Sequence, residues 1–487
     1  MRESKKWLLV LCINLFLLAA FSLAIAEEGK MPITTSSAEA MKNYLAGRDL
    51  ADKLRALDSK AYFEKAVQAD PNFALGYLNL AFAVPSAKEF FECFDKARAL
   101  ADKVSEGERL WILGIEAANN GLPAKQEEYY KQMVALYPND ERAQTLLGNF
   151  YFGQQNYPEA VKYFEHAEKI NPEYSQPYNQ MGYAYRFLNQ YDQAEKAFQK
   201  YIQLIPDDPN PYDSYAELFM KMGQFEKSIE YYRKALKVDP QFAASHLGIA
   251  TDFNFLGRYE DARAQLKTFY DGAVNDGQRR AAHFAMAVSY MDQEDSKNAL
   301  AEFDKQYELA AKINDATNKA GDLFAMGNIL LFIGQPDEAL MKYTQAKDEV
   351  LKSDRSDEIK NNARLGFLYN EGKVAAAKGD LAKAKANQLE YAKGAQANNN
   401  QFQLWLSHEL AGIIALAEKD YDKAIAEFGQ ANQQDTYNLY RIGLAYKEKG
   451  DKVKAREMFD KVAKYNQLTN LNYSFVKAQA QKILASM

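Results

Sequence analysis

QNYPEAVKYFEHAEKINP at residues 155–172 is followed by NQYDQAEKAFQKYIQLIP at 189–206 and by GQFEKSIEYYRKALKVDP at 223–240. Each stretch begins 34 residues after the one before it, and each ends in proline. The same spacing extends back to Pro138. A fixed period of 20 to 50 residues is typical of repeat architectures. The repeat therefore decides how the chain is organised, and the length of 487 residues does not indicate three separate domains.

Each period contains two helical patterns. In the first stretch Ala160 is followed by Phe164 and Ala167, and offsets of four and seven place these residues on one helical face. Another small residue, Gly148, lies twelve positions before Ala160, and the turn sequence GQQN (153–156) separates the two. We predict two antiparallel helices in contact at the small residues, with the aromatic ring beside that contact. Proline then ends the second helix, because it has no amide hydrogen.

The sequence resembles the tetratricopeptide repeat family, whose signature is L-G-x-x-Y, then A-x-x-x-F, then P. LLGNFY (146–151), AVKYF (160–164) and Pro172 match this signature, and the resemblance covers nearly the whole chain after residue 26. It implies an all-α fold, an α-solenoid of about twelve stacked antiparallel helix pairs that form a right-handed superhelix. The leading residues of the twelve second helices are Ser59, Phe90, Gln126, Ala160, Ala194, Ser228, Ala262, Ala299, Ala339, Ala384, Ala424 and Ala455.

The repeats predict the following organisation. A short leader (27–39) precedes N-terminal repeats (40–242), which are regular from residue 107, and C-terminal repeats (243–468) with longer, irregular spacing. A capping helix (469–487) follows. Residues 348–360 are expected to lengthen helices or loops between repeats, and QANNNQFQ (396–403) is expected to be a linker.

The first 26 residues have the pattern of a signal peptide. Arg2, Lys5 and Lys6 precede the apolar run from Trp7 to Ala26, which ends in the small-x-small sequence Ala-Ile-Ala. An uncleaved anchor is the alternative, since twenty residues are enough to span a bilayer. We expect an exported chain, periplasmic or extracellular, which contacts a membrane only if this segment is retained.

The rest of the composition argues against catalysis and against nucleic acid. After residue 26 there are 57 basic and 65 acidic residues, a net charge of −8, so no basic excess favours nucleic acid. Cys93 is the only cysteine after that point, which rules out an intramolecular disulfide. No nucleotide-binding, hydrolase or metalloprotease motif occurs. The four histidines (His166, His246, His283 and His408) fall in four different repeats. We expect no enzyme activity, no cofactor and no metal.

The resemblance also implies where a partner would bind. In this family the first helices line a concave groove, and the positions that face it here include Arg142, Asn149, Asn179, Tyr183, Arg186, Asp213 and Glu217. Only Asn149 fits the family's clamp for a terminal carboxylate, so recognition of that kind is not expected. Further on, the same positions become apolar, with Phe284, Val288, Met291, Phe324, Asn328 and Leu331. These residues are either an apolar partner surface or, as we favour, ordinary core after a shift in register.

A chain filled by such repeats leaves no room for a catalytic domain. We therefore expect a non-enzymatic scaffold or adaptor that binds partner proteins or peptides on its concave face. The alternative is an exported ligand-binding protein for glycan or peptide fragments, in which some of the 32 tyrosines stack on the ligand.

Overall fold

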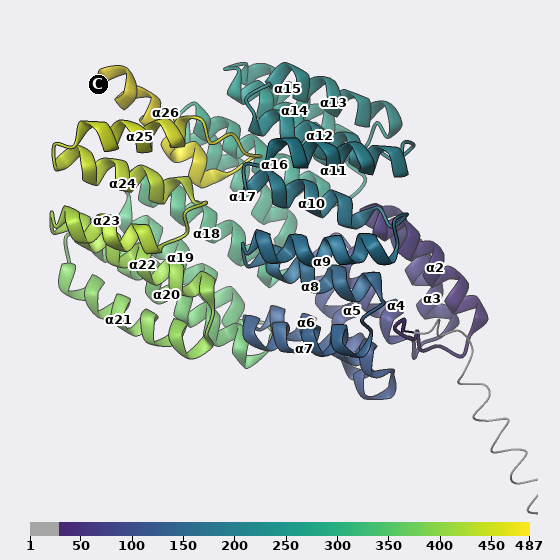
Figure 1. Ribbon diagram of the computed structural model, residues 1–487. Coiled ribbons are helices and arrows are strands. Elements are labelled where there is room, and N and C mark those ends of the chain that lie inside the picture. Colours follow the sequence, from purple (N-terminus) through teal and green to yellow (C-terminus); the bar gives the residue numbers. More distant parts are fainter. Residues whose placement is uncertain (1–28) are drawn as a thin grey trace, which may run out of the picture.

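The protein is an α-solenoid built from helical hairpins (Figure 1). The computed structural model describes residues 29–487, so the predicted signal peptide lies outside the described residues. Within them there are 25 α-helices, one short 3-10 helix, Ala101–Lys103, and no strand. Consecutive helices pair as twelve antiparallel hairpins, and one further helix follows. The predicted all-α solenoid of about twelve helix pairs is confirmed.

Two sets of helices alternate along the chain. The first helices of the hairpins are α2 (Ala38–Asp52), α4 (Ala74–Ala83), α6 (Glu106–Asn119), α8 (Glu141–Gly153), α10 (Gln176–Phe187), α12 (Asn210–Lys221), α14 (Ala243–Phe255), α16 (Asp276–Asp292), α18 (Ala316–Phe332), α20 (Asp357–Ala377), α22 (Gln401–Ala417) and α24 (Thr436–Glu448). The second helices are α3 (Ala56–Ala69), α5 (Ala87–Ala99), α7 (Pro123–Leu136), α9 (Tyr157–Ile170), α11 (Tyr191–Leu204), α13 (Phe225–Val238), α15 (Tyr259–Asp271), α17 (Ser296–Lys312), α19 (Pro336–Lys352), α21 (Leu381–Asn398), α23 (Tyr421–Gln430) and α25 (Lys452–Ala463). The chain closes with α26 (Leu471–Ser486). Across residues 29–487, no helix combines the length and the hydropathy that a membrane crossing requires.

A contact between a glycine and an aromatic ring holds the two helices of a hairpin together. A Cβ atom on Gly148 would lie 2.5 Å from the ring of Phe164, so only hydrogen fits between them. The ring is fully buried, as is the predicted small residue Ala160. The same contact recurs sixteen residues apart in other hairpins, as Gly47–Phe63, Gly114–Tyr130, Gly182–Phe198, Gly327–Tyr343, Gly412–Phe428 and Gly443–Phe459.

The ends of the helices follow the predicted turn chemistry. Helices α7, α9, α11 and α13 each end two residues before a proline. Within the hairpins, the turn after the first helix requires one residue with positive φ, which Gln155 (φ 60°) and Gly223 (φ 75°) supply. The chain thereby reverses direction over two or three residues, and the two helices can pack along their length.

Longer helices explain the irregular spacing after residue 275. Helices α16 to α22 contain 17 to 21 residues, whereas α8 to α15 contain 12 to 14. Most of residues 348–360 extend α19 and α20, as expected. The linker expected at 396–403 was wrong, because α21 continues to Asn398 and α22 begins at Gln401.

The solenoid coils so that hairpins far apart in sequence touch. Figure 1 shows the blue hairpins α6–α9 beside the green hairpins α20–α23. The Nδ2 atoms of Asn362 and Asn400 donate to the backbone carbonyls of Asn120 (2.9 Å) and Gly121 (3.0 Å). Another such contact joins Tyr157 on α9 to Gln434, 277 residues later (2.9 Å). Amide side chains therefore join successive coils of the superhelix.

Helix α26 covers more than the last hairpin. It packs against α25 and α24 and also against α16, some 190 residues earlier. Phe475, which is 2% exposed, stacks on Phe332 of α18 with ring centroids 4.5 Å apart. Nearer the C-terminal end of α26, Lys482 pairs with Glu294 (2.7 Å) in the turn after α16. The end of the chain is therefore inserted against the inner side of the C-terminal hairpins.

Candidate functional site

The first helices of the hairpins line the inner face of the solenoid. The predicted groove residues all lie on three of them: Arg142 and Asn149 on α8, Asn179, Tyr183 and Arg186 on α10, and Asp213 and Glu217 on α12. Along the first helices the inner face has three parts, which follow one another in sequence order. We name them the N-terminal groove, at α2 to α8, the central face, at α10 to α14, and the C-terminal cavity, at α16 to α24.

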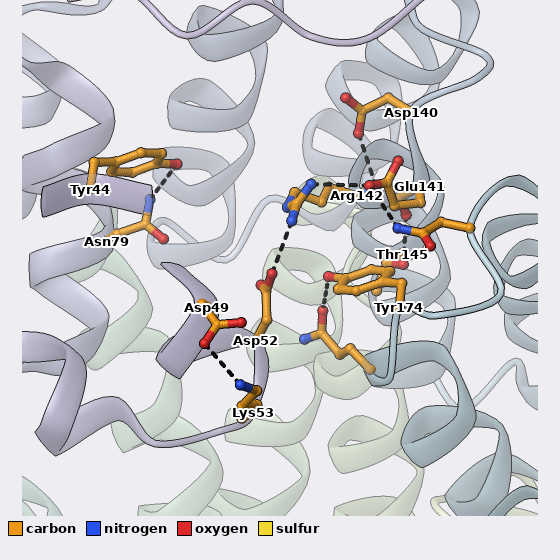
Figure 2. Close-up of polar contacts among 12 residues, drawn as sticks. Tyr44, Asp49, Asp52, Lys53, Asn79, Asp140, Glu141, Arg142, Thr145 and Tyr174 are labelled. Atoms are coloured by element: carbon orange, nitrogen blue, oxygen red, sulfur yellow. Dashed lines mark hydrogen bonds and ion pairs between the residues drawn. The ribbon is translucent and has the colours of Figure 1, made fainter. Parts of the chain in front are cut away.

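Arg142 organises the polar contacts at the N-terminal end of the inner face (Figure 2). Its Nη2 atom lies 3.0 Å from Asp52 Oδ2 on α2, and its Nη1 atom lies 3.1 Å from Glu141 Oε1. Its guanidinium also lies 5.3 Å from the ring centroid of Tyr174. Burial raises the pKa of Asp52 although Arg142 opposes the shift. The arginine thus links α2 and α8, whose hairpins are separated by two others in the sequence.

Beside this network lies the N-terminal groove, two hollows of about 380 and 300 Å³ that share Arg48, Trp111 and Arg142 in their walls. Arg48 makes no ion pair with any described residue. Trp111 Nε1 and Asn149 Oδ1 have no hydrogen-bond partner within residues 29–487. Phe82, 49% exposed, lines the larger hollow. The groove therefore combines a cation that makes no ion pair, the carboxylates of Asp52, Asp140 and Glu141, unpaired buried polar atoms and exposed apolar surface.

Four of the predicted residues meet on the central face. Glu217 accepts hydrogen bonds from the Tyr183 hydroxyl (2.8 Å) and from Arg186 Nη1 (2.9 Å). Burial, together with the neighbouring Glu217, raises the pKa of Asp213, which accepts a hydrogen bond from Ser245 (2.6 Å). Their polar groups are largely directed at one another.

The other predicted residues lie apart from that cluster. Arg142 is engaged with Asp52, and Asn179 is 1% exposed with an Oδ1 atom that has no partner in the described chain. The partner-binding role of these seven residues stays a prediction.

The central face is covered by the segment that leads into α26. Lys221 Nζ donates to the backbone carbonyl of Tyr465 (2.6 Å) and lies 3.9 Å from that ring's centroid. The hydroxyls of Thr251 and Thr469 are 2.8 Å apart, and Leu468 packs against the core of α12–α15. Burial lowers the pKa of Lys221 to about 8. Here the chain's own residues occupy the surface that a partner would need.

The C-terminal cavity has a volume of about 830 Å³ and is lined by α16, α18, α20, α22, α24 and the start of α26. This volume is in the range of small-molecule sites. The cavity walls decide between the two interpretations of the apolar groove positions, an apolar partner surface or ordinary core. Val288 and Met291 are buried core, as we favoured, whereas Phe284, Phe324 and Leu331 line the cavity.

A few charged groups stand among these apolar walls. Arg441 Nη1 lies 2.7 Å from Glu409 Oε1, and the guanidinium lies 3.9 Å from the ring centroid of Tyr437. Burial opposes ionisation of Glu409, but Arg441 and Lys373 outweigh it and lower its pKa. Burial raises the pKa of Asp435 to about 6 and lowers that of Lys373 to about 8. Sequence reasoning missed this set, because its members come from different hairpins.

Three of the four histidines contact a residue within their own hairpin. His246, His283 and His408 on first helices each face the residue nineteen positions later on the second helix, at 2.6, 2.6 and 2.8 Å. In residues 29–487 no three His, Cys, Asp or Glu side chains converge as metal ligands would. Their spacing thus reflects the hairpin geometry.

Hairpins stacked around a shared inner face define the class of the protein, an α-solenoid of helix-turn-helix repeats. Models of the tetratricopeptide repeat family match residues 141–207, 216–242 and 437–466. The chain contains tetratricopeptide repeats. The matched segments are α8–α11, most of α12–α13 and α24–α25, hairpins whose helices have 12 to 14 residues.

Similar solved structures include a tetratricopeptide repeat protein from Parabacteroides merdae, at 14% identity and a TM-score of 0.36, which covers 56% of this chain and 93% of that chain. MamA from Desulfovibrio magneticus is 18% identical with a TM-score of 0.29, over 34% of this chain and 95% of that one. No curated protein sequence matches the chain.

Proposed function

We propose that this protein is an exported, non-enzymatic scaffold that binds a segment of a partner protein in the N-terminal groove. Tetratricopeptide repeats generally mediate protein–protein interactions, which supports the class of function. The observation that carries the location is the open inner face at α2, α4, α6 and α8. Every residue that lines the two hollows lies before residue 177, so the C-terminal segment takes no part in their walls.

The chemistry of the groove favours a peptide that carries both an acidic and an apolar side chain. Arg48 offers a cation, and Phe82 and Leu54, 42% exposed, offer apolar surface. Trp111 and Asn149 line the larger hollow beside these groups. A partner segment would thus pair with Arg48 and cover apolar surface that the folded chain leaves exposed.

A selection from a random peptide library tests this proposal. Peptides selected on the purified wild-type protein should contain an acidic residue close to an apolar one. Arg48→Ala should weaken their binding at least about tenfold, since it removes a partly desolvated charge pair. Arg233→Ala is the matched control, because Arg233 is exposed on the second helix α13. Equal affinity for wild type and Arg48→Ala would exclude the groove as the site.

Export rests on the pattern of residues 1–26. In a bacterial host with an outer membrane, we expect the protein in the periplasmic fraction with a mass that begins at Glu27. A full-length chain retained in the cytoplasm would contradict export, and a full-length chain in the membrane fraction would favour the uncleaved anchor.

A further inference from the structure

The C-terminal cavity has mainly apolar walls from several hairpins. Phe284 of α16, Phe324 of α18, Ile413 of α22 and Phe475 of α26 contribute to them. Because α26 packs against α16 and α24, it closes one side of a space that the first helices alone would leave as an open groove. The result is a compartment of small-molecule size rather than a surface for a folded partner.

Lys373 of α20 places a cation at the wall of this compartment. Its Nζ atom donates to Asn328 Oδ1 (3.2 Å), a neutral acceptor, and it makes no ion pair with any described residue. The ring centroid of Tyr369 lies 4.7 Å from Nζ, and that of Phe324 lies 5.7 Å away. Aromatic faces attract the ammonium only weakly compared with a carboxylate.

The other charges of the cavity already have partners within the protein. Arg441 is paired with Glu409 (2.7 Å). The carboxylate of Asp435 accepts from the backbone amide of Tyr437 (2.9 Å) and from Asn472 Nδ2 (3.0 Å). Lys373 is therefore the cavity cation with no carboxylate at hydrogen-bond distance among the described residues, although Glu409 and Asp435 act on it electrostatically. The carbonyl oxygen of Asn370, a residue 7% exposed in the same wall, also has no donor in the described chain.

We propose that the C-terminal cavity binds an organic acid with an apolar body, whose carboxylate pairs with Lys373 Nζ. The ligand's hydrocarbon or aromatic part would lie against the apolar walls, and burial of that part would drive most of the binding. Its carboxylate would meet the one ammonium in the cavity walls, which makes no ion pair with any described residue, in surroundings where a charge-assisted hydrogen bond is strong. A glycan fits less well, because its many hydroxyls would face walls with few hydrogen-bonding groups. This site is separate from the N-terminal groove and does not depend on the scaffold function.

Gly366 allows part of the cavity to be filled without disturbing the fold, and Gly429 provides a matched control position. Gly366 of α20 lies in the wall, and a Cβ atom there would meet nothing within 4 Å. Leucine at this position would project into the open space, and its higher helix propensity would support α20. Gly429 of α23 is the matched control, since its Cβ would also meet nothing within 4 Å but it does not line the cavity.

Isothermal titration calorimetry with decanoate and with 1-decanol tests the site on the purified protein. We expect one saturable site for decanoate on the wild type. Lys373→Met should weaken decanoate at least about tenfold and change 1-decanol less than about twofold. Gly366→Leu should weaken binding of both, because its side chain takes up part of the cavity, whereas Gly429→Leu should match the wild type.

Several outcomes would overturn the proposal. These are no saturable decanoate binding to the wild type, equal decanoate affinity in Lys373→Met, and wild-type affinity for both ligands in Gly366→Leu. Circular dichroism melts verify that each variant is folded. If Lys373→Met fails to fold, the comparison of Gly366→Leu with Gly429→Leu decides the matter alone. Peptide binding in the N-terminal groove is measured separately, so failure at one site is distinguishable from failure at the other.

Discussion

Gly182 and Phe198 show how single residues set the spacing of a hairpin. A Cβ atom on Gly182 would lie 2.5 Å from the Phe198 ring, which is fully buried. No ordinary side-chain contact is that short, so the helices would have to separate or the ring would have to leave its place. Because the pair is only sixteen residues apart, the sequence alone predicted the contact.

We expect Gly182→Ala to destabilise the protein by roughly 1–3 kcal/mol, since one added methyl group overfills a packed core. Gly429→Ala should be neutral or stabilising by up to about 1 kcal/mol, because alanine is the better helix former and the Cβ has free space. Urea midpoints of the two variants and the wild type provide the comparison. If both variants unfold at the wild-type midpoint, the close contact does not hold the hairpin together.

Asp252 is the clearest single residue whose ionisation opposes folding. It lies on α14 and is 0% exposed, and neither carboxylate oxygen has a hydrogen-bond partner within residues 29–487. The nearby Ser228 hydroxyl donates to the Ala216 carbonyl (2.9 Å). Burial raises the pKa of Asp252 to about 8. The folded state therefore keeps a proton that the unfolded state releases near pH 4.

Because the folded state holds this proton more tightly than the unfolded state, we predict that the free energy of unfolding depends on pH. The contribution of protonated Asp252 is full below about pH 4 and is lost as the pH rises through about 8. Asp252→Asn should unfold near the wild-type urea midpoint at about pH 4 and be more stable by at least about 1 kcal/mol at pH 9. Asp304→Asn, at an exposed position on α17, should follow the wild type at both. Parallel profiles for wild type and Asp252→Asn would refute this role.

Helix α26 decides how much of the inner face is open. Its sequence predicted a capping helix, and it did not predict that the helix would reach α16 and α18. Tyr473, Phe475 and Val476 are at most 3% exposed, although they lie near the end of the chain. Terminal helices are usually the first to fray, but this one is anchored by aromatic rings on two sides.

Removal of one anchor should release this helix. We expect Phe475→Ala to cost about 3–5 kcal/mol in local stability, because the ring is fully packed against Phe332 and Tyr437. Gln481→Ala changes an exposed position of the same helix and should have little effect. Limited proteolysis should cut Phe475→Ala within residues 464–475 and spare both the control and the wild type. Equal resistance of all three would show that α26 is held by other contacts.

For the whole molecule, the structure departs from the sequence-based prediction at contacts between hairpins that are not neighbours. Periodicity predicted the hairpins because their helices meet within about 20 residues. The Arg142–Asp52 pair, the cover of Tyr465 over Lys221 and the cavity around Lys373 depend on how the solenoid curves. A repeat signature specifies neither that curvature nor the greater lengths of helices α16–α22. The degenerate second and third repeats also concealed Trp111 and Phe82.

Amide side chains join the coils, and their loss should loosen the molecule locally. The double variant Asn362→Ala, Asn400→Ala removes donors to the backbone carbonyls of Asn120 and Gly121. We expect faster hydrogen exchange in residues 117–123, measured by mass spectrometry, while other hairpins stay unchanged. Asn72→Ala, at an exposed position after α3, serves as control. Unchanged exchange in 117–123 would mean that these bonds do not close the coils.

Partner binding at the N-terminal groove of the inner face is the function that we propose. Its most direct test is site-specific photo-crosslinking with a peptide selected on the wild-type protein. The photoreactive residue p-benzoylphenylalanine is placed at Phe82 in the groove or at Val453, which is 80% exposed on the second helix α25. We expect a covalent adduct from position 82 and none above background from position 453. Equal yields at the two positions, or an adduct from position 453 alone, would contradict it.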